Sequence, residues 1–186
     1  VHLGCGLDSR FWRVDNGLVH WYDLDMAPVV ELRRQFYAES DRYQMIASSV
    51  TDLTWVDGVD AAGRSVLVVA EGLLMYLDEA DVRRLVLRLH EALPGCQLIA
   101  DVFSRLTARL ATRHASLKAT GATTGWGIDD PHELEAWAPG IRLLEAWHFS
   151  SDPELAHLSP RWRLAYKLAG AFKMVQRAHR IVHYQL

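Results

Sequence analysis

The chain has only two cysteines among its 186 residues, Cys5 and Cys96. So few cysteines exclude a disulfide framework, and no Cys/His cluster has the spacing of a zinc site. We therefore expect no bound metal, and a reducing cytoplasm is the expected compartment.

The sequence also has little net charge and no long apolar run. Its formal net charge is −3, and the basic residues that gather between 161 and 180 are interpreted as a solvated surface. No apolar run approaches the ~20 residues that cross a bilayer. These features argue against nucleic acid and membranes as partners, so we expect a small molecule. The oligomeric state is left open.

The turn that opens the chain lacks a third glycine. Gly4-Cys5-Gly6 follows three mostly apolar residues, so the segment is interpreted as the end of a strand, a turn and the start of a helix. Glycines at this spacing let a ligand lie against the backbone. A dinucleotide fingerprint would need glycine where Ser9 stands, which disfavours a NAD site. A turn without any ligand is the alternative.

What is present suits one globular domain. Half of the residues are apolar, and the length fits a single core. Only residues 1–3 precede the glycine turn, whereas a buried strand usually has about five or six residues. We therefore expect the chain to be a fragment, or the ordered part, of a longer protein that carries more of this strand.

Apolar periodicity predicts strands that alternate with helices. The predicted strands are 18–22 with its acidic end at 23–25, 43–47, 65–70, 97–103, 141–149 and 180–186; the predicted helices are 28–39, 79–93, 105–118, 130–137 and one that starts at Ser159. Segment 66–70 is uniformly apolar, which is typical of a strand buried on both faces. The pattern predicts an α/β fold, with a mostly parallel sheet and helices on both faces.

Acidic residues follow two of these strands, where open α/β sheets bind ligands. Asp25 lies about twenty residues after the glycine turn, a position suited to ribose hydroxyls, and it is preferred over Asp23 because it is closer to the loop. Glu71 directly follows the strand 65–70. Helix capping is the alternative for Asp25, and for Glu71 it is less favoured because Asp78 can cap the next helix.

Four segments together resemble the leucine carboxyl methyltransferase-like family, in particular its bacterial branch of polyketide-type O-methyltransferases. They are Leu-Gly-Cys-Gly-Leu-Asp-Ser-Arg at 3–10, Trp-Tyr-Asp-Leu-Asp at 21–25, Thr-Asp-Leu-Thr-Trp at 51–55 and Ala-Glu-Gly-Leu-Leu-Met-Tyr-Leu at 70–77. The similarity continues through residues 126–127 and 147 to the C-terminus. It implies a Rossmann-like class I methyltransferase fold: a mostly parallel seven-stranded sheet with one antiparallel strand, whose final hairpin falls on 141–149 and 180–186.

The resemblance also implies S-adenosyl-L-methionine as the cofactor. The implied contacts are Gly4, Cys5 and Gly6 in the turn, Asp25 at the ribose, Ser49 and Val50 at the adenine, and Glu71 near the methionine end. Family members often have an acid where Ser49 stands. They also have an N-terminal helical segment with basic residues, and none of these can be assigned here. We expect residues 1–186 to be one methyltransferase domain without that segment.

Asp8 is a further candidate, because negative charge is favourable beside a cationic cofactor. Its alternative role is to cap the helix after the glycine turn, which is worth about 1 kcal/mol. Tyr76, just beyond Glu71, is a candidate contact for the methyl acceptor, with packing as its alternative. No catalytic residue is assigned otherwise.

Methyl transfer from a sulfonium depends on alignment and exclusion of water more than on proton transfer. A carboxylate acceptor needs no base, whereas a hydroxyl acceptor generally does. No histidine–acid pair stands out in the sequence, and the histidines are interpreted as surface or core residues. The sequence therefore favours O-methylation of a small molecule, with a carboxylate of a polyketide-like metabolite as acceptor. The alternative is a catalytically inert member that binds the cofactor or a partner protein.

Overall fold

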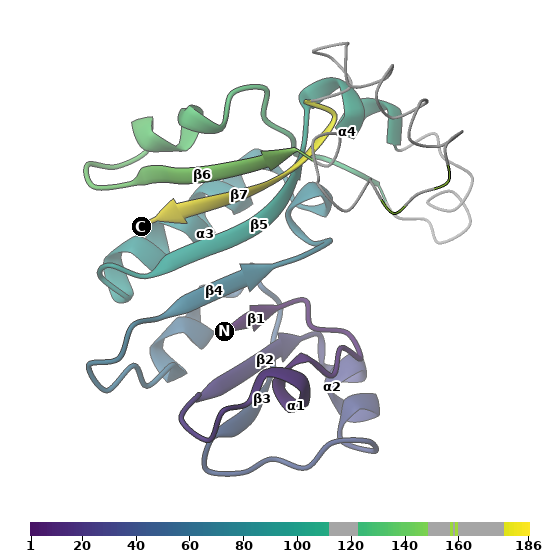
Figure 1. Cartoon of the computed structure of the whole chain (residues 1–186), viewed down its shortest axis with the longest axis vertical. Coiled ribbons are helices and arrows are strands. Elements are labelled where there is room, and N and C mark those ends of the chain that lie inside the picture. Colours follow the sequence, from purple (N-terminus) through teal and green to yellow (C-terminus); the bar gives the residue numbers. More distant parts are fainter. Residues whose placement is uncertain (112–122, 149–156, 158, 160–176) are drawn as a thin grey trace.

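A seven-stranded sheet forms the centre of the part of the chain that the computed structural model describes, residues 1–111, 123–148, 157, 159 and 177–186 (Figure 1). The strands are β1 (His2–Leu3), β2 (Trp21–Asp25), β3 (Tyr43–Ala47), β4 (Leu67–Ala70), β5 (Gln97–Phe103), β6 (Arg142–His148) and β7 (His179–Gln185). The helices are α1 (Arg10–Val14), α2 (Ala27–Arg33), α3 (Glu79–Ala92) and α4 (Arg105–Ala111), with 3-10 segments η1 (Leu53–Gly58), η2 (Leu74–Tyr76) and η3 (Pro131–Ala136).

The strand order is β3-β2-β1-β4-β5-β7-β6. Strands β1 to β5 run parallel, and β7 lies antiparallel between β5 and β6. The mostly parallel sheet with one antiparallel strand is therefore confirmed. The predicted final hairpin corresponds to β6 and β7, with bounds that differ by one residue at each end of both strands.

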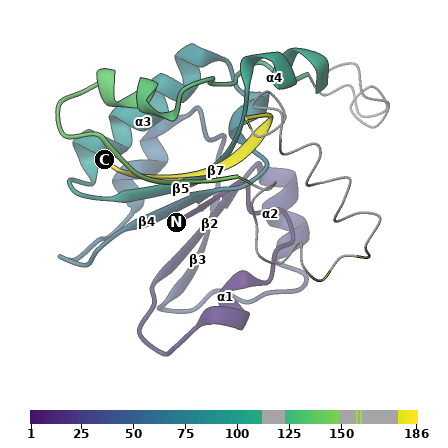
Figure 2. The ribbon, with the colours of Figure 1, turned by 45° about the horizontal axis from the view of Figure 1, so that its top comes forward.

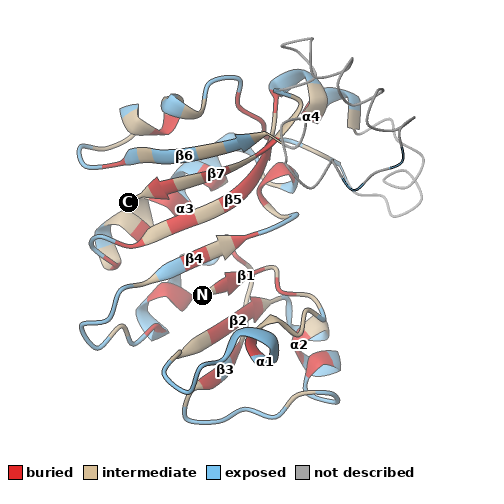
Figure 3. Cartoon of the chain, in the orientation of Figure 1, coloured by how far each residue is buried: buried red, intermediate tan, exposed pale blue. Residues whose placement is uncertain are grey.

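Helices cover both faces of the sheet, as predicted. Figure 2 shows α3 on one side and α1 with α2 on the other. The apolar stripe of α3 belongs to the main core with Val68 and Leu98, whereas Phe11 of α1 and Val30 of α2 pack with Tyr43 in a second cluster. Two faces of one sheet are thus buried separately, and every strand except β6 contains buried positions (Figure 3).

The helix α3 forms as its sequence predicts. The Asp78 carboxylate accepts a hydrogen bond from the Asp81 amide and caps the first turn, and the buried stripe of Val82, Leu85, Val86 and Leu89 faces the core. The Pro-Gly pair at 94–95 follows its end. Local signals and tertiary burial agree along this helix, which explains why its predicted bounds are nearly correct.

Some predicted bounds are wrong. Strand β2 begins at Trp21 rather than at residue 18, because the Asn16 side chain accepts hydrogen bonds from the Leu18 and Val19 amides and bends the chain there. Helix α2 ends at Arg33 rather than near residue 39. Strand β4 begins at Leu67, two residues later than predicted. The segment 130–137, predicted as a helix, forms the 3-10 segment η3. The rest of the helix predicted at 105–118, the helix predicted from Ser159 and most of the basic residues at 161–180 lie outside the described residues.

Gly127 provides a test of the packing between the end of β5 and residues 125–128. A Cβ at this position would lie 2.8 Å from the Ser104 carbonyl oxygen and 2.9 Å from the Phe103 carbonyl oxygen. Gly127→Ala is therefore expected to lower the free energy of unfolding by about 1–3 kcal/mol, the usual effect of overpacking. Urea denaturation measures this, with Gly58→Ala as control because a Cβ there meets no described atom within 4 Å. Equal stability of the two variants would contradict the packing.

Candidate functional site

The parallel strands end along one side of the sheet (Figure 1). The predicted site residues lie there, at the carboxyl ends of these strands or in the segments that follow them. The register pairs Leu3 at the end of β1 with Leu24 of β2 on one side and with Ala70 of β4 on the other. The glycine turn, Asp25 and Glu71 therefore leave neighbouring strands at one level. The loop after β3 joins them there, since Asp25 pairs with Ala47.

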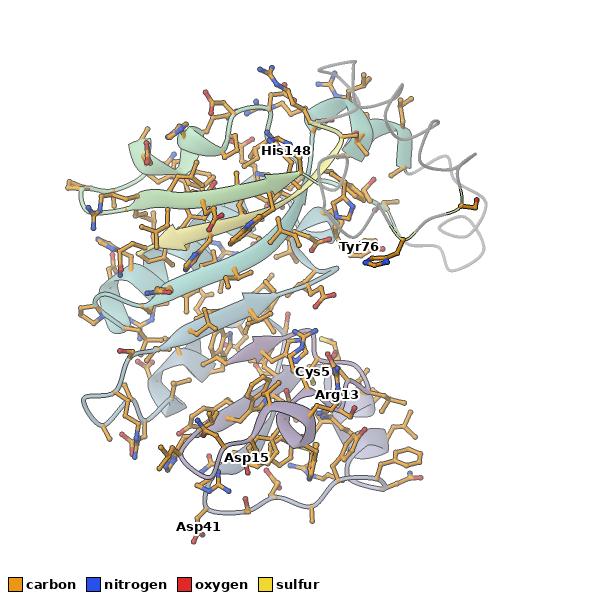
Figure 4. The ribbon with its side chains drawn as sticks, in the orientation of Figure 1. Cys5, Arg13, Asp15, Asp41, Tyr76 and His148 are labelled. Carbon is orange, nitrogen blue, oxygen red and sulfur yellow. The ribbon has the colours of Figure 1, made fainter. Side chains whose placement is uncertain are left out.

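The glycine turn presents bare backbone at this edge. Gly4 and Gly6 have φ angles of +65° and +51°, which favour glycine, and no described atom would lie within 4 Å of a Cβ at Gly6. Cys5 between them is buried, and burial raises the pKa of its thiol to about 12. Only the backbone of Cys5 is therefore available to a ligand, while Gly6 leaves room for one. Figure 4 shows Cys5 on the same edge as Tyr76.

Asp25, the last residue of β2, is hydrogen-bonded to the glycine turn. One carboxylate oxygen accepts the Gly6 amide at 2.8 Å and the other accepts the Met26 amide at 2.7 Å. Each oxygen keeps a second lone pair, so the carboxylate can accept hydroxyl groups as well. The expected capping role is met only in part, because the N-cap residue of α2 is Met26 and it has no side-chain capping bond.

Arg10 joins two of the predicted acids. Its guanidinium lies 2.6 Å from the Glu71 carboxylate and 3.0 Å from the Asp8 carboxylate, and Arg13 donates to Asp8 at 2.8 Å. Burial alone would raise the pKa of Asp8, but the hydrogen bond from Arg13 and the charge of Arg10 outweigh it and lower that pKa. The capping role proposed for Asp8 is wrong, since Ser9 is the N-cap residue of α1 and no side chain caps it.

The two predicted adenine residues are held in a compact loop after β3. The Ser49 hydroxyl shares a hydrogen bond of 2.8 Å with Thr51, and the Val50 carbonyl accepts the Trp55 indole N–H at 3.3 Å. Val50 is buried and Ser49 half-buried. Their orientation is fixed within the protein, because the Ser49 hydroxyl also accepts the Thr51 amide and the Ser49 carbonyl accepts the Asp52 amide.

A buried ionic cluster beneath the glycine turn was not predicted. Arg33 and Asp23 form an ion pair with almost no exposed surface, and Tyr43 donates its hydroxyl to Asp23 at 2.7 Å. Arg33 also donates to the carbonyl oxygens of Gly6 at 2.9 Å and Asp8 at 2.7 Å. We call Asp23, Arg33 and Tyr43 the Asp23 cluster. It holds the Gly6 and Asp8 carbonyls from one side, while the amides of Gly4 and Cys5 donate to the Leu24 carbonyl and that of Gly6 donates to Asp25, so the conformation of the turn is fixed on both sides.

The charge on Asp23 makes stability depend on pH. Burial would raise the pKa of Asp23, but its contact with His2, hydrogen bonds from Tyr43 and Trp21 and the charge of Arg33 lower it. A carboxyl with a depressed pKa stabilises the fold above its unfolded pKa of about 3.9, and this stabilisation is lost as the pH falls through the folded value.

Tyr43→Phe removes one of these hydrogen bonds and is therefore expected to raise the pKa of Asp23, so that acid destabilisation starts at a higher pH than in the parent chain. Urea denaturation between pH 6 and pH 2 measures the onset. Tyr37→Phe is the control, since the Tyr37 hydroxyl donates only to the Leu7 carbonyl, at 3.3 Å. An identical onset in the parent chain and Tyr43→Phe would contradict the assignment.

His179 forms a histidine–acid pair that the sequence analysis did not identify. Its Nε2 lies 2.8 Å from the Asp101 carboxylate, and Asp101 also accepts the Gly72 amide at 2.7 Å. The pair lies at the end of β5 and the start of β7, next to the residue that follows Glu71. Sequence reasoning could not find it because 78 positions separate its members. Tyr76 is 44% exposed in η2, so a packing role does not occupy its side chain.

A cavity of about 570 Å³ lies elsewhere, at the opposite edge of the sheet. Its lining includes Val1, Trp21 and Leu67 at the starts of β1, β2 and β4. None of the predicted site residues lines this cavity, but Arg10, which contacts Asp8 and Glu71, does. Within the described residues, no helix is long and apolar enough to cross a membrane, and no group of three or more histidine, cysteine or acidic side chains is arranged to hold a metal ion.

Comparisons with known proteins agree with this architecture. Residues 1–90 match the family model "Leucine carboxyl methyltransferase". The chain is 41% identical over 185 residues to the tetracenomycin polyketide synthesis O-methyltransferase TcmP of Streptomyces glaucescens, covering 99% of this chain and 68% of that protein. It is 29% identical over 160 residues to the S-adenosyl-L-methionine-dependent methyltransferase dpfgK of Gibberella zeae, covering 78% of this chain and 53% of the relative.

Solved structures share the fold at low sequence identity. A methyltransferase from Thermobifida fusca superposes with a TM-score of 0.68 at 16% identity. The match covers 99% of this chain and 71% of the Thermobifida chain. An S-adenosylmethionine-dependent methyltransferase from Mesorhizobium loti superposes with a TM-score of 0.67 at 14% identity. The match covers 100% of this chain and 89% of the Mesorhizobium chain. These likenesses confirm the class I methyltransferase fold. The 41% identity to TcmP, together with the family match of residues 1–90, shows that the chain belongs to the leucine carboxyl methyltransferase family and is an S-adenosylmethionine-dependent O-methyltransferase.

Proposed function

We propose that residues 1–186 form one methyltransferase domain that transfers a methyl group from S-adenosylmethionine to a carboxylate of a polyketide-like molecule. The observation that carries the proposal is the open side of Gly6 in the glycine turn, flanked by Asp25 and Glu71 at the carboxyl ends of the strands. The polyketide-type acceptor is inferred from the 41% identity to TcmP, whose printed name links it to polyketide synthesis.

In this proposal the bare backbone at Gly4 and Gly6 lies against the cofactor, Asp25 accepts its ribose hydroxyls and the loop at 49–50 contacts its adenine. The bound cofactor supplies an electrophilic methyl group on a sulfonium. Negative charge at Glu71 favours that cation, and Arg10, which pairs with Glu71 in this structure, is placed to meet the carboxylate of the methionine part.

The acceptor carboxylate needs no base, because it is ionised and nucleophilic at neutral pH. The chain then has to orient one carboxylate oxygen in line with the methyl group and keep water away. Tyr76, exposed just beyond Glu71, is the proposed contact for the acceptor.

The test combines binding with turnover. The chain is titrated with S-adenosylhomocysteine by calorimetry and then incubated with S-adenosylmethionine and a panel of polycyclic aromatic acids, such as 2-naphthoic acid and anthraquinone-2-carboxylic acid. Mass spectrometry is expected to detect the methyl esters. Cofactor binding without ester formation from any acid would overturn the carboxylate proposal and favour the inert alternative.

A further inference from the structure

Asp101 is a buried acid near the end of β5, beside the strand that leads to Glu71. The register pairs Ala100 of β5 with Ala70, the last residue of β4, so Asp101 lies level with Glu71 just beyond β4 (Figure 1). Asp101 is only 9% exposed, and its neighbours Ala100 and Val102 are almost wholly buried. A buried carboxylate costs free energy unless it is hydrogen-bonded, so its contacts indicate its role.

The Asp101 carboxylate takes the place of a strand carbonyl beyond the end of β4. One of its oxygens accepts the Gly72 amide at 2.7 Å, and the other lies 2.8 Å from Nε2 of His179. The register of β4 with β5 ends at Ala70 and Ala100, so a side chain of β5, rather than its backbone, holds Gly72. The peptide between residues 71 and 72 is therefore tied to β5 by Asp101.

This hydrogen bond restricts the direction in which Glu71 leaves the backbone. A peptide group is planar, so holding the Gly72 N–H also orients the Glu71 carbonyl and limits the position of its Cα. The Glu71 side chain is 63% exposed, and its carboxylate lies 2.6 Å from the Arg10 guanidinium. An exposed glutamate has several rotamers, which an ion pair with one arginine restricts only in part. The anchored backbone is thus a second restraint on Glu71.

We infer that Asp101 is a positioning residue of the methyl transfer: through the Gly72 amide it holds Glu71 where its carboxylate faces the sulfonium of S-adenosylmethionine. The inference rests on the proposed cofactor site and on the proposed role of Glu71 there. Asp101 acts through the backbone and does not contact the cofactor. Because Glu71 is held before the cofactor binds, less of its attraction to the cation is offset by the entropy of ordering the chain.

Two cofactor analogues that differ in charge separate positioning from a general loss of structure. Sinefungin carries a protonated amine in place of the methylsulfonium group, whereas S-adenosylhomocysteine has a neutral sulfur there. Calorimetry gives the dissociation constant of S-adenosylhomocysteine divided by that of sinefungin, which we call the charge preference. Asp101→Ala is expected to lower it by about tenfold, the usual worth of a hydrogen bond to a charged group. A loss of stability alone would weaken both ligands equally.

Asp101→Asn distinguishes position from charge. The asparagine oxygen can still accept the Gly72 amide, so the charge preference should stay within about threefold of the parent value. Gln97→Ala is the matched control, because Gln97 lies at the other end of β5 and pairs with His183 of β7 at 2.8 Å. This variant should bind both analogues like the parent chain. An unchanged charge preference in Asp101→Ala, or an equal loss in Asp101→Asn, would overturn the inference.

Glu71→Gln separates a failure of this inference from a failure of the proposed function. It should lower the charge preference at least as much as Asp101→Ala does. A loss in Glu71→Gln with no change in Asp101→Ala would overturn the role of Asp101 alone. An unchanged charge preference in Glu71→Gln, or no binding of either analogue by the parent chain, would overturn the proposed cofactor contacts and the inference with them.

Hydrogen exchange in the parent chain tests the hydrogen bond without any substitution. In the chain labelled with ¹⁵N-glycine, the Gly72 amide should exchange with solvent deuterium about tenfold more slowly than the amide of Gly63, which lies in an exposed turn. Equal exchange rates would show that Asp101 does not hold the Gly72 amide and would overturn the inference.

Discussion

Arg33→Met is expected to lower the free energy of unfolding by about 3–5 kcal/mol, because removing one partner of a buried ion pair leaves the other charge without compensation. Asp23 is almost wholly buried and would keep only the polar contacts from Tyr43, Trp21 and His2. The Gly6 and Asp8 carbonyls would lose their guanidinium donor at the same time. The glycine turn should therefore loosen as the fold weakens, and affinity for S-adenosylhomocysteine should fall with it.

Urea denaturation of both chains gives the free energies. Arg34→Met is the matched control, because Arg34 is the next residue, its side chain is 47% exposed and it pairs with Glu39 at 3.6 Å. An exposed pair contributes little, so this variant should lie within about 1 kcal/mol of the parent chain. If Arg33→Met were as stable as Arg34→Met, the Asp23 cluster would not support the turn.

Asp25→Ala is expected to raise the dissociation constant of S-adenosylhomocysteine by about 100-fold or more. The proposed ribose contact supplies two hydrogen bonds to a charged acceptor, each worth about 1.5–3 kcal/mol, and about 1.4 kcal/mol corresponds to a tenfold change in affinity. The same substitution removes the acceptor of the Gly6 amide, so the turn is also less ordered before binding. Isothermal titration calorimetry measures the change.

Two comparisons isolate the ribose contact. Asp41→Ala removes an exposed acid that Figure 4 places away from Cys5 and Tyr76, and it should bind like the parent chain. Adenine alone lacks the ribose, so any weak binding of adenine should change little in Asp25→Ala. An unaltered dissociation constant for S-adenosylhomocysteine in Asp25→Ala would show that Asp25 is not the ribose acceptor.

The sequence predicted best those elements in which local signals and burial agree. Strand β5 (Gln97–Phe103) has the predicted bounds, and α3 differs by one residue, because both carry an apolar pattern framed by a cap or a Pro-Gly turn. Asp25 and Glu71 were proposed for a related reason: ligand sites of parallel sheets lie at strand ends, and strand ends can be located from the apolar pattern. The short 3-10 segments and the start of β2 were not predicted correctly. They depend on turns formed by side chains such as that of Asn16, and such turns leave only a weak signal in the sequence.

The residues that sequence analysis missed act through partners far along the chain. Asp23 looked like a second choice beside Asp25, although an acid flanked by apolar strand residues signals a buried partner. That partner, Arg33, is buried in α2, and its neighbours in the sequence, which include Glu31, Arg34 and Gln35, do not distinguish it from an exposed arginine. Asp101 and His179 come together only because β7 enters the sheet next to β5. Long-range pairing of this kind follows from topology, which a single sequence reveals only coarsely.

NMR of the chain labelled with ¹⁵N-glycine, titrated with S-adenosylhomocysteine, tests the central claim most directly. The chain has 12 glycines, and they sample both edges of the sheet. We expect the amide signals of Gly4, Gly6 and Gly72 to shift. Those of Gly17 and Gly63, next to residues that line the 570 Å³ cavity at the opposite edge, should stay in place. Shifts at Gly17 and Gly63 with unmoved signals at the glycine turn would contradict a cofactor site at the carboxyl ends of the strands.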